Sequence, residues 1–262
     1  MAWEELLKEA EEACRMAGDM LSKNIDSSRE ISYKGAVDLV TDFDKRSQDV
    51  ILSHLSSRFP DHDFLAEEDI SERGGSEYRW IIDPIDGTTN YAHNLPIFCV
   101  SIALEWKSEI VCGAVYDPMR KEMFSAIKGK GSVLNEQRIR TSMTDDLDKS
   151  LLATGFPYDV RESEVNNIDH FSNFATRVQA IRRCGSAALD LCYVACGRFD
   201  GFWELKLNPW DVAAGILIVE GSGGRVTGFR GGRTTHFGKN LLASNGLIHE
   251  QMIQVLKLGK QL

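Results

Sequence analysis

The stretch Trp80 to Asn90, W-I-I-D-P-I-D-G-T-T-N, decides how the rest of the chain is interpreted. Three apolar residues lead into two aspartates, Asp83 and Asp86, and a small hydroxyl-rich turn follows them. Pro84 disfavours the helical region for the residue before it and supplies no backbone donor. We therefore expect the strand to end or to reach a sheet edge here. Two carboxylates and the Ile85 carbonyl are the oxygen ligands that suit a hard cation such as Mg²⁺.

The turn after Asp86 offers a place for an anion. Gly87 permits an unusual backbone angle or the close approach of a ligand. If Thr88-Thr89-Asn90 begins a helix, its free backbone amides can bind a phosphate beside a hydroxyl. The simpler interpretation is a strand-to-helix turn that Asp86 caps. Acids and free amides together favour a site where a divalent metal meets a phosphate.

Further acids lie far from this stretch in the sequence. Glu67-Glu68 follows a short expected strand, and such pairs are often only solvated surface residues. In Asn208-Pro209-Trp210-Asp211, the asparagine can cap a helix and the proline fits its first position. Asp211 then projects from the first helical turn, where a carboxylate also interacts favourably with the helix dipole. Both are candidates for completing a metal cluster.

The spacing of apolar residues predicts a first half in which two helices cover a largely antiparallel sheet. The helices are expected over 3–21 and 41–58, and the strands over 64–66, 80–82, 97–106, 110–116 and 122–126, with another hairpin at 129–131. Residues 27–40 form a short hairpin or loop around Lys34. Thr41 suits an N-cap, so helix capping is the simpler role for Asp42 and Asp44.

The second half alternates strands and helices, which predicts an α/β unit with helices on both sheet faces. The strands are expected over 151–154, 181–183, 199–204, 225–227 and 241–244, and the helices over 165–178, 186–195, 209–220 and 248–258. A polar stretch near residue 145 divides the chain into 1–145 and 146–262. We expect these halves to form one catalytic unit.

The composition is that of a globular protein. Of 262 residues, 43% are hydrophobic and 26% charged, and the net charge of −9 argues against a nucleic-acid-binding face. The six cysteines form no C-x-x-C pair, which indicates reduced thiols. No signal peptide or membrane-spanning run is evident, so we expect a cytoplasmic protein.

Three motifs, Glu67-Glu68, Asp83 to Asn90 and Trp210-Asp211, resemble the signatures of the inositol monophosphatase family. The similarity extends over essentially the whole chain and includes Lys34 with Val37 to Thr41, Gly129 to Gly131, and Gly185 to Asp190. It implies a layered α-β-α-β-α sandwich of the sugar phosphatase type. It also implies a cofactor, two to three Mg²⁺ per site, and sensitivity to lithium.

The resemblance assigns a role to each matching residue. It implies that metals are held by Glu67, Asp83, the Ile85 carbonyl, Asp86 and Asp211. Thr88 and Asp44 would activate the attacking water, assisted by Glu67 and by Lys34 near the third metal. The substrate would contact Asp86, Gly87, Thr88, Ala187, Glu204 and Asp211.

Several functions remain open from sequence alone. We favour hydrolysis of myo-inositol monophosphate by direct attack of water, because no nucleophilic cysteine or histidine lies in a phosphatase-like loop. Fructose 1,6-bisphosphate, a nucleotide 3′-phosphate and histidinol phosphate are alternative substrates. A regulatory partner of the transcription machinery and a sugar sensor without turnover are alternative classes. We expect a homodimer, and Arg182 and Arg183 are equally suited to a second phosphate, to solvent or to an interface.

Overall fold

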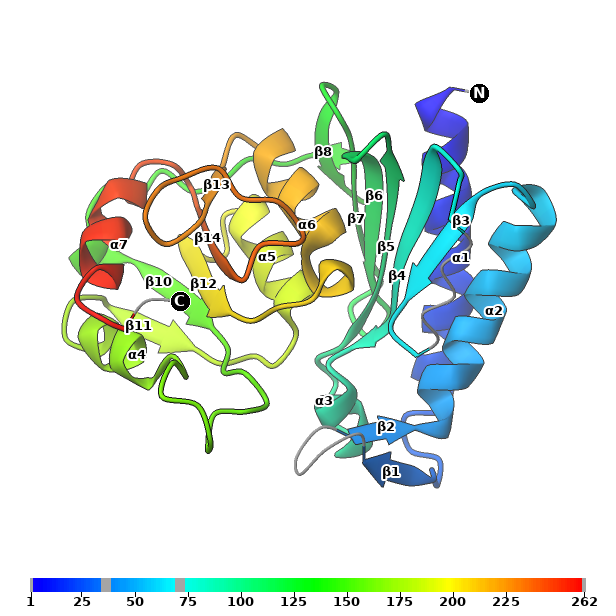
Figure 1. Ribbon diagram of the computed structural model, residues 1–262, viewed down its shortest axis with the longest axis horizontal. Helices are drawn as coiled ribbons and strands as arrows, with labels where there is room; N and C mark the ends of the chain where they lie inside the picture. The colour runs from blue at the N-terminus through cyan, green and yellow to red at the C-terminus, as the bar shows by residue number, and fades with distance from the viewer. Residues whose placement is uncertain (1, 34–38, 69–73, 261–262) are drawn as a thin grey trace.

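The protein is built of five alternating layers of helices and sheets (Figure 1). This computed structural model describes residues 2–33, 39–68 and 74–260. Helices α1 (Trp3–Lys23) and α2 (Asp42–Arg58) cover the outer face of a seven-stranded sheet, and α5 (Ala187–Ala195) and α6 (Pro209–Gly221) lie between it and a five-stranded sheet. Helices α4 (Ile168–Ala175) and α7 (His249–Leu256) form the last layer. The expected α-β-α-β-α sandwich is confirmed.

The seven-stranded sheet has the order β3-β4-β5-β6-β7-β8-β9 and is antiparallel except for the parallel pair β3–β4. Its strands are β3 (Asp63–Ala66), β4 (Tyr78–Asp86), β5 (Cys99–Trp106), β6 (Glu109–Asp117), β7 (Glu122–Ile127), β8 (Gly131–Leu134) and β9 (Gln137–Arg138). A separate hairpin pairs β1 (Ile31–Tyr33) with β2 (Leu39–Thr41), which confirms the hairpin interpretation. Lys34 lies outside the described residues.

Strand β4 continues through Pro84 instead of ending before it. Asp83 pairs with Ser101 and Asp86 pairs with Cys99, so β4 has one residue more than β5 between these two pairs. In a regular strand, residues three apart point to opposite faces, and the additional residue of a β-bulge returns both aspartates to one face. The last pair between β3 and β4 joins Ala66 with Ile82. Pro84 lies beyond that pair, where β4 has no neighbour on this side among the described residues and is an edge of the sheet.

The five-stranded sheet has the order β11-β10-β12-β14-β13 and contains parallel and antiparallel pairs. Its strands are β10 (Leu151–Thr154), β11 (Ala180–Arg182), β12 (Gly201–Leu205), β13 (Arg225–Thr227) and β14 (Asn240–Ser244). The helix expected over 165–178 is shorter, because Asn167 adopts φ 73° before it. The side chain of Asn167 donates to the Gly155 carbonyl and accepts from Trp203 Nε1, which holds the loop ahead of α4.

Close packing around two glycines places α6 at the centre of the molecule. A Cβ on Gly113 of β6 would lie 3.0 Å from Ala214 of α6, and a Cβ on Gly215 would lie 2.5 Å from Leu191 of α5. These close approaches seat α6 against both the seven-stranded sheet and α5, and so fix its N-terminus. No helix in the described part of the chain is long and apolar enough to cross a membrane.

Candidate active site

One pocket between the two halves collects the residues that the sequence analysis singled out. Its lining includes Glu67, Asp83, Ile85, Asp86, Gly87, Thr88, Ala187, Glu204 and Asp211. Asp44 lies behind the lining, fully buried, and contacts Thr88. Lys34 is outside the residues that the structure describes. Glu67 and Asp211 lie 144 residues apart in the sequence and meet in this pocket. They meet because α5 and α6 pack onto the seven-stranded sheet.

Asp86 joins the two halves. Its Oδ2 accepts hydrogen bonds from the Ser186 hydroxyl and the Ala188 amide, each at 2.7 Å, and its Oδ1 accepts from the Ala187 amide at 3.3 Å. Asp86 therefore satisfies donors at the start of α5, where a carboxylate also interacts favourably with the helix dipole. Burial raises the pKa of Asp86, and these hydrogen bonds oppose that increase. The capping role considered from sequence is real, but the capped helix is α5 rather than the one that follows Asp86.

The other acids of the pocket repel one another. Burial, then the charges of Glu67, Asp86 and Asp211, raise the pKa of Asp83 well above its usual value. Burial, followed by the charge of Asp86, likewise raises the pKa of Asp211. Asp211 also accepts a bond from the Asn208 amide at 2.7 Å, as part of the helix cap anticipated at the start of α6. The result is a concentration of acidic groups in one pocket.

The Thr88 hydroxyl and the Asp44 carboxylate lie within hydrogen-bond distance of each other. Thr88 Oγ1 lies 2.9 Å from Asp44 Oδ1 and 2.9 Å from the Ile85 carbonyl, and its single hydrogen can be donated to only one of them. Asp44 Oδ2 accepts from both the amide and the hydroxyl of Thr41, each at 2.7 Å, in a capping box at the start of α2. Burial raises the pKa of Asp44 to about 6, against these hydrogen bonds. Asp44 thus both caps α2 and contacts Thr88.

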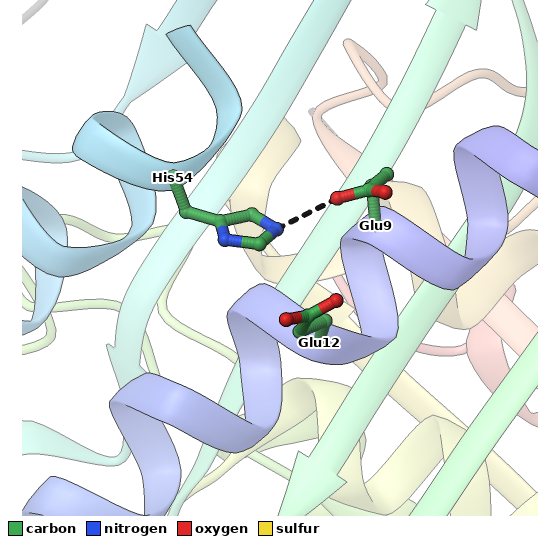
Figure 2. Close-up of side chains that lie close together, drawn as sticks. All are labelled: Glu9, Glu12 and His54. Carbon is green, nitrogen blue, oxygen red and sulfur yellow. Dashed lines mark hydrogen bonds and ion pairs between the residues drawn. The ribbon is translucent and has the colours of Figure 1, made fainter. Parts of the chain in front are cut away.

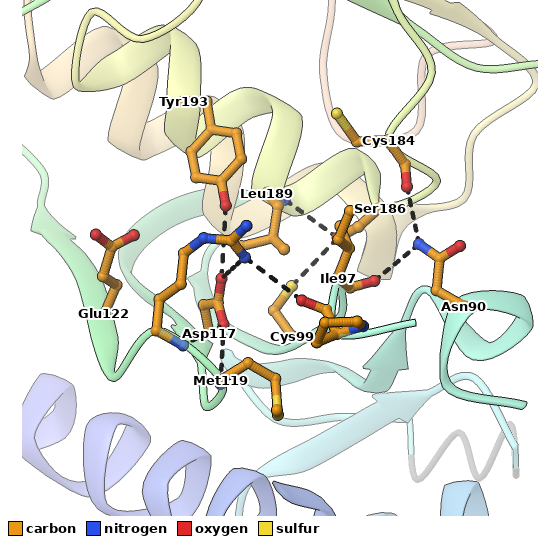
Figure 3. A network of polar contacts seen from close by, with 12 residues as sticks. Asn90, Ile97, Cys99, Asp117, Met119, Glu122, Cys184, Ser186, Leu189 and Tyr193 are labelled. Atoms are coloured by element: carbon orange, nitrogen blue, oxygen red, sulfur yellow. Dashed lines mark hydrogen bonds and ion pairs between the residues drawn. The ribbon is translucent and has the colours of Figure 1, made fainter. Parts of the chain in front are cut away.

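Asn90, the last residue of the opening motif, holds two loops together and was not identified as a site residue from sequence. Its Nδ2 donates to the carbonyls of Ile97 and Cys184, each at 2.8 Å (Figure 3). Gly87 lies in the same junction with φ 101°, and a Cβ there would come within 2.9 Å of the Ile97 carbonyl. The glycine is required by the chain itself, which approaches closely on both sides. Asn90 thereby fixes the segment that contains Ser186, whose hydroxyl donates a hydrogen bond to Asp86.

A second acidic wall of the pocket is formed by Glu204 and Asp190. Burial, followed by the charge of Asp190, raises the pKa of Glu204 to about 8. A Cβ on Gly155 would lie 2.2 Å from Glu204 Oε1, so a larger residue at 155 would displace this carboxylate. Both adjacent arginines are exposed; Arg183 lines the pocket, whereas Arg182 Nη1 donates to the Ile181 carbonyl.

The donor set fits a hard cation such as Mg²⁺. It consists of carboxylates and a carbonyl, all oxygen ligands, whose mutual repulsion a divalent cation would relieve. Of the two basic residues in the lining, Lys206 Nζ already lies 2.5 Å from Asp159 Oδ2. The basic residues of the lining therefore do not balance the charge of the pocket acids.

A different group, Glu9, Glu12 and His54, has its ligand atoms within 4.8 Å of one another (Figure 2). It lies on α1 and α2, on the outer side of the seven-stranded sheet. Glu9 Oε2 lies 2.9 Å from His54 Nε2 and 2.6 Å from Arg58 Nε. A guanidinium thus already compensates the carboxylate, and the geometry is that of an ion-pair cluster.

Comparison with known proteins gives the family. The model of the inositol monophosphatase family matches residues 2–260. The chain belongs to the inositol monophosphatase family. It is therefore a phosphatase, a hydrolase of phosphoric monoesters, and its fold is that of the family's solved members.

Individual relatives match over nearly their whole length. An inositol-1-monophosphatase of a Synechocystis species is 44% identical over 258 residues, 97% of this chain and 90% of that protein. The Nus factor SuhB of Salmonella typhimurium is 42% identical over 251 residues, 95% of this chain and 94% of that protein. A solved inositol monophosphatase from Anabaena (Nostoc) has a TM-score of 0.88 at 40% identity, covering 99% of this chain and 98% of that one.

Proposed function

We propose that the protein is a Mg²⁺-dependent phosphomonoesterase that hydrolyses myo-inositol monophosphate to inositol and phosphate. The observation that carries the proposal is the meeting, in one pocket, of the repelling acids with the Thr88–Asp44 pair. Two to three Mg²⁺ would be held by Glu67, Asp83, Asp86, Asp211 and the Ile85 carbonyl. A solved relative, an IMPase/NADP phosphatase at 25% identity, was crystallised with Ca²⁺, which supports a divalent ion in such a pocket.

The residues of the chain divide the catalytic work. A water hydrogen-bonded to Thr88 Oγ1 gives up a proton as Thr88 donates its own to Asp44 Oδ1, 2.9 Å away. A proton acceptor with a pKa of about 6 suits this step near neutral pH. Backbone amides of Gly87 and Thr88 would orient the phosphate. When bound, the Mg²⁺ ions lower the pKa of the attacking water and stabilise charge on the phosphate and the leaving oxygen.

The second wall favours a polyol monophosphate over a bisphosphate. Glu204 and Asp190 are hydrogen-bonding groups for hydroxyls and, when ionised, would repel a second phosphate. Arg183 opposes this repulsion from the rim, whereas Lys206 is engaged with Asp159 and Ser163. Acidic charge outweighs basic charge on this wall, so we place inositol monophosphate ahead of fructose 1,6-bisphosphate.

A phosphate-release panel with Mg²⁺ tests the proposal. It compares myo-inositol 1-phosphate with fructose 1,6-bisphosphate, a nucleotide 3′-phosphate and histidinol phosphate, with Li⁺ added to test inhibition. We expect inositol 1-phosphate to be hydrolysed with the highest kcat/KM. Tenfold faster turnover of fructose 1,6-bisphosphate would reverse the order of the two substrates.

Substitution of Thr88 tests the proton relay. Thr88→Ala should lower kcat by about 10²- to 10⁴-fold, the range typical of proton transfer by a positioned group. Thr88→Ser is the matched control, because it keeps the hydroxyl and should retain most of the activity. Equal loss in both variants would show that the methyl group, and not the hydroxyl, matters.

A second candidate function, binding to the transcription machinery, is suggested by the relatives named Nus factor SuhB. It would use a surface and not the pocket. Asp86→Asn removes an anionic ligand, so it should abolish hydrolysis while leaving such binding intact. A pulldown with RNA polymerase and its associated factors, carried out with the wild type and with Asp86→Asn, would separate the two roles.

A further inference from the structure

Lys206 joins the loops that follow two neighbouring strands at the rim of the pocket. Strands β10 and β12 are parallel neighbours, so the loops after them leave the same edge of the five-stranded sheet. Residues 156–158 of the first loop line the pocket, as does Lys206 of the second. Between the loops, Lys206 Nζ lies 2.5 Å from Asp159 Oδ2 and 2.9 Å from Ser163 Oγ. A single side chain therefore ties together two segments that contribute to the lining.

The backbone of Lys206 has a conformation that most side chains avoid. Its φ is 61°, in the left-handed region that favours glycine. The amide of Lys206 donates to the Lys239 carbonyl at 2.7 Å. This bond continues the pairing of β12 with β14, whose last pair is Leu205 with Asn240, so the sheet fixes the backbone here. Such conformations gather at functional sites. A lysine where glycine would fit more easily indicates a role for the ammonium group.

The ion pair restrains the middle of the first loop, between fixed ends. At the two ends, the Asn167 side chain donates to the Gly155 carbonyl at 2.6 Å. In the middle, Lys206 is the only cation that pairs with Asp159 among the residues that the structure describes, and Asp159 Oδ1 is buried without a hydrogen bond in that same part. A partly buried carboxylate without its cation is better solvated by water. Loss of the ammonium group would therefore let Asp159 turn toward water and shift the neighbouring residues 156–158.

We propose that Lys206 is a positioning residue, whose ion pair with Asp159 holds residues 156–158 in place as a wall of the pocket. The inference rests on the proposed function, because it concerns the binding of substrate in that same pocket. Lys206 acts through the loop and not by contact with the substrate, since its ammonium group already has a carboxylate and a hydroxyl as partners. Its removal should therefore weaken substrate binding more than it slows the chemical step.

Steady-state kinetics of two variants distinguish this role from direct contact with the substrate. Lys206→Met removes the ammonium group and keeps most of the alkyl stem, and Asp159→Asn removes the other charge. We expect KM for myo-inositol 1-phosphate to rise about three- to tenfold in each, the range of a partly exposed ion pair, with a smaller change in kcat. The double variant should be no worse than either single one, because the same interaction is lost.

Two results of these kinetics would overturn the proposal. If the lysine instead bound the phosphate ester directly, Asp159→Asn would free its ammonium group and lower KM. Additive losses in the double variant would show that the two residues act independently.

Two further substitutions at position 206 separate the charge from the backbone strain. Lys206→Arg keeps the charge and should restore most of the affinity that Lys206→Met loses. Lys206→Gly suits the backbone angle, so it should have a higher Tm than Lys206→Met, yet the same increase in KM. A wild-type KM in Lys206→Gly would contradict the proposal, because the ion pair would then be dispensable.

Hydrogen exchange separates this inference from the catalytic proposal. The amide of Ser163 donates to the Asp159 carbonyl at 2.9 Å, inside the first loop. Exchange in peptides from residues 156–163, measured without substrate, should be about three- to tenfold faster in Lys206→Met than in the wild type. Faster exchange supports the inference even if the wild-type protein fails to hydrolyse inositol phosphate. Unchanged exchange contradicts it, whatever the activity of the wild type.

Discussion

Two clusters of acidic side chains occupy opposite faces of the seven-stranded sheet and differ in how their charge is balanced. On the outer face, Glu9 contacts both His54 and Arg58. On the inner face, Asp83 lies among acids whose charges raise its pKa. The outer cluster contains its own cation, whereas the inner cluster concentrates charge beyond what its lining compensates.

The difference separates a structural cluster from a functional one better than proximity does. The ligand atoms of Glu9, Glu12 and His54 lie within 4.8 Å of one another, which by distance alone resembles a metal site. The pocket acids are distinguished by burial, mutual repulsion and a shortage of neighbouring positive charge. Uncompensated charge costs stability, and in a native protein it marks a place where a ligand supplies the balance.

The largest effect should come from Asp83→Asn. We expect Mg²⁺-dependent phosphate release to fall about a thousandfold or more, about 4 kcal/mol of lost transition-state stabilisation. In EDTA the Tm of the variant should exceed that of the wild type, because one repelled carboxylate is gone. Saturating Mg²⁺ should stabilise the wild type by about 2.7 kcal/mol at a hundred times Kd, and the variant by much less. Equal stabilisation of both by Mg²⁺ would show that Asp83 is not a ligand.

A smaller effect is expected from Asn90→Asp. The new carboxylate would face the carbonyls of Ile97 and Cys184 and could donate to neither. Displacement of the loop that carries Ser186 should lower kcat/KM about ten- to a hundredfold, a range typical of residues that orient metal ligands. Steady-state kinetics with titrated Mg²⁺ would measure this loss. Asn90→Gln is the control that keeps the amide but lengthens it; a fully active Asn90→Asp would contradict the positioning role.

The pH dependence of stability should report the charge on the second wall. The pKa of Glu204 is raised to about 8 in the folded protein, so the folded state binds more protons than the unfolded state. Its contribution to stability is present at low pH and is lost as the pH rises through about 8. In EDTA, the fall in Tm between pH 5 and pH 8.5 should therefore be steeper for the wild type than for Glu204→Gln. Parallel curves would remove Glu204 from the explanation.

The smallest effect belongs to the outer cluster. Glu9→Gln keeps the hydrogen-bonding shape but loses the charge that pairs with Arg58, a side chain that is 43% exposed. We expect a loss of about 0.5–1 kcal/mol in the free energy of unfolding by urea, with phosphatase activity unchanged. Glu12→Gln, nearby and exposed, is the matched control and should change neither quantity. A drop in activity in Glu9→Gln would undo the contrast between the two faces.

Much of this arrangement is legible in the sequence. Capping at Thr41 and at Asn208, and the strand before Asp83, follow from local residue preferences, and the capping signals place Asp44 and Asp211 in the first turns of α2 and α6. The bulge in β4 was not predicted, because it depends on how Asp83 and Asp86 pair with β5. The hydrogen bonds that join Asn90 and Asp86 to the segment 184–188 were not predicted either, since that segment lies about a hundred residues away.

The contact between Asp86 and the first turn of α5 has a consequence for the assembly of the active site. The carboxylate belongs to the seven-stranded half and its donors belong to the other, so neither half contains the finished pocket. A chain divided between β9 and β10 would yield two fragments without phosphatase activity. Phosphatase turnover would then return only on their reassociation, so the protein could serve as a split reporter that reads out its own assembly.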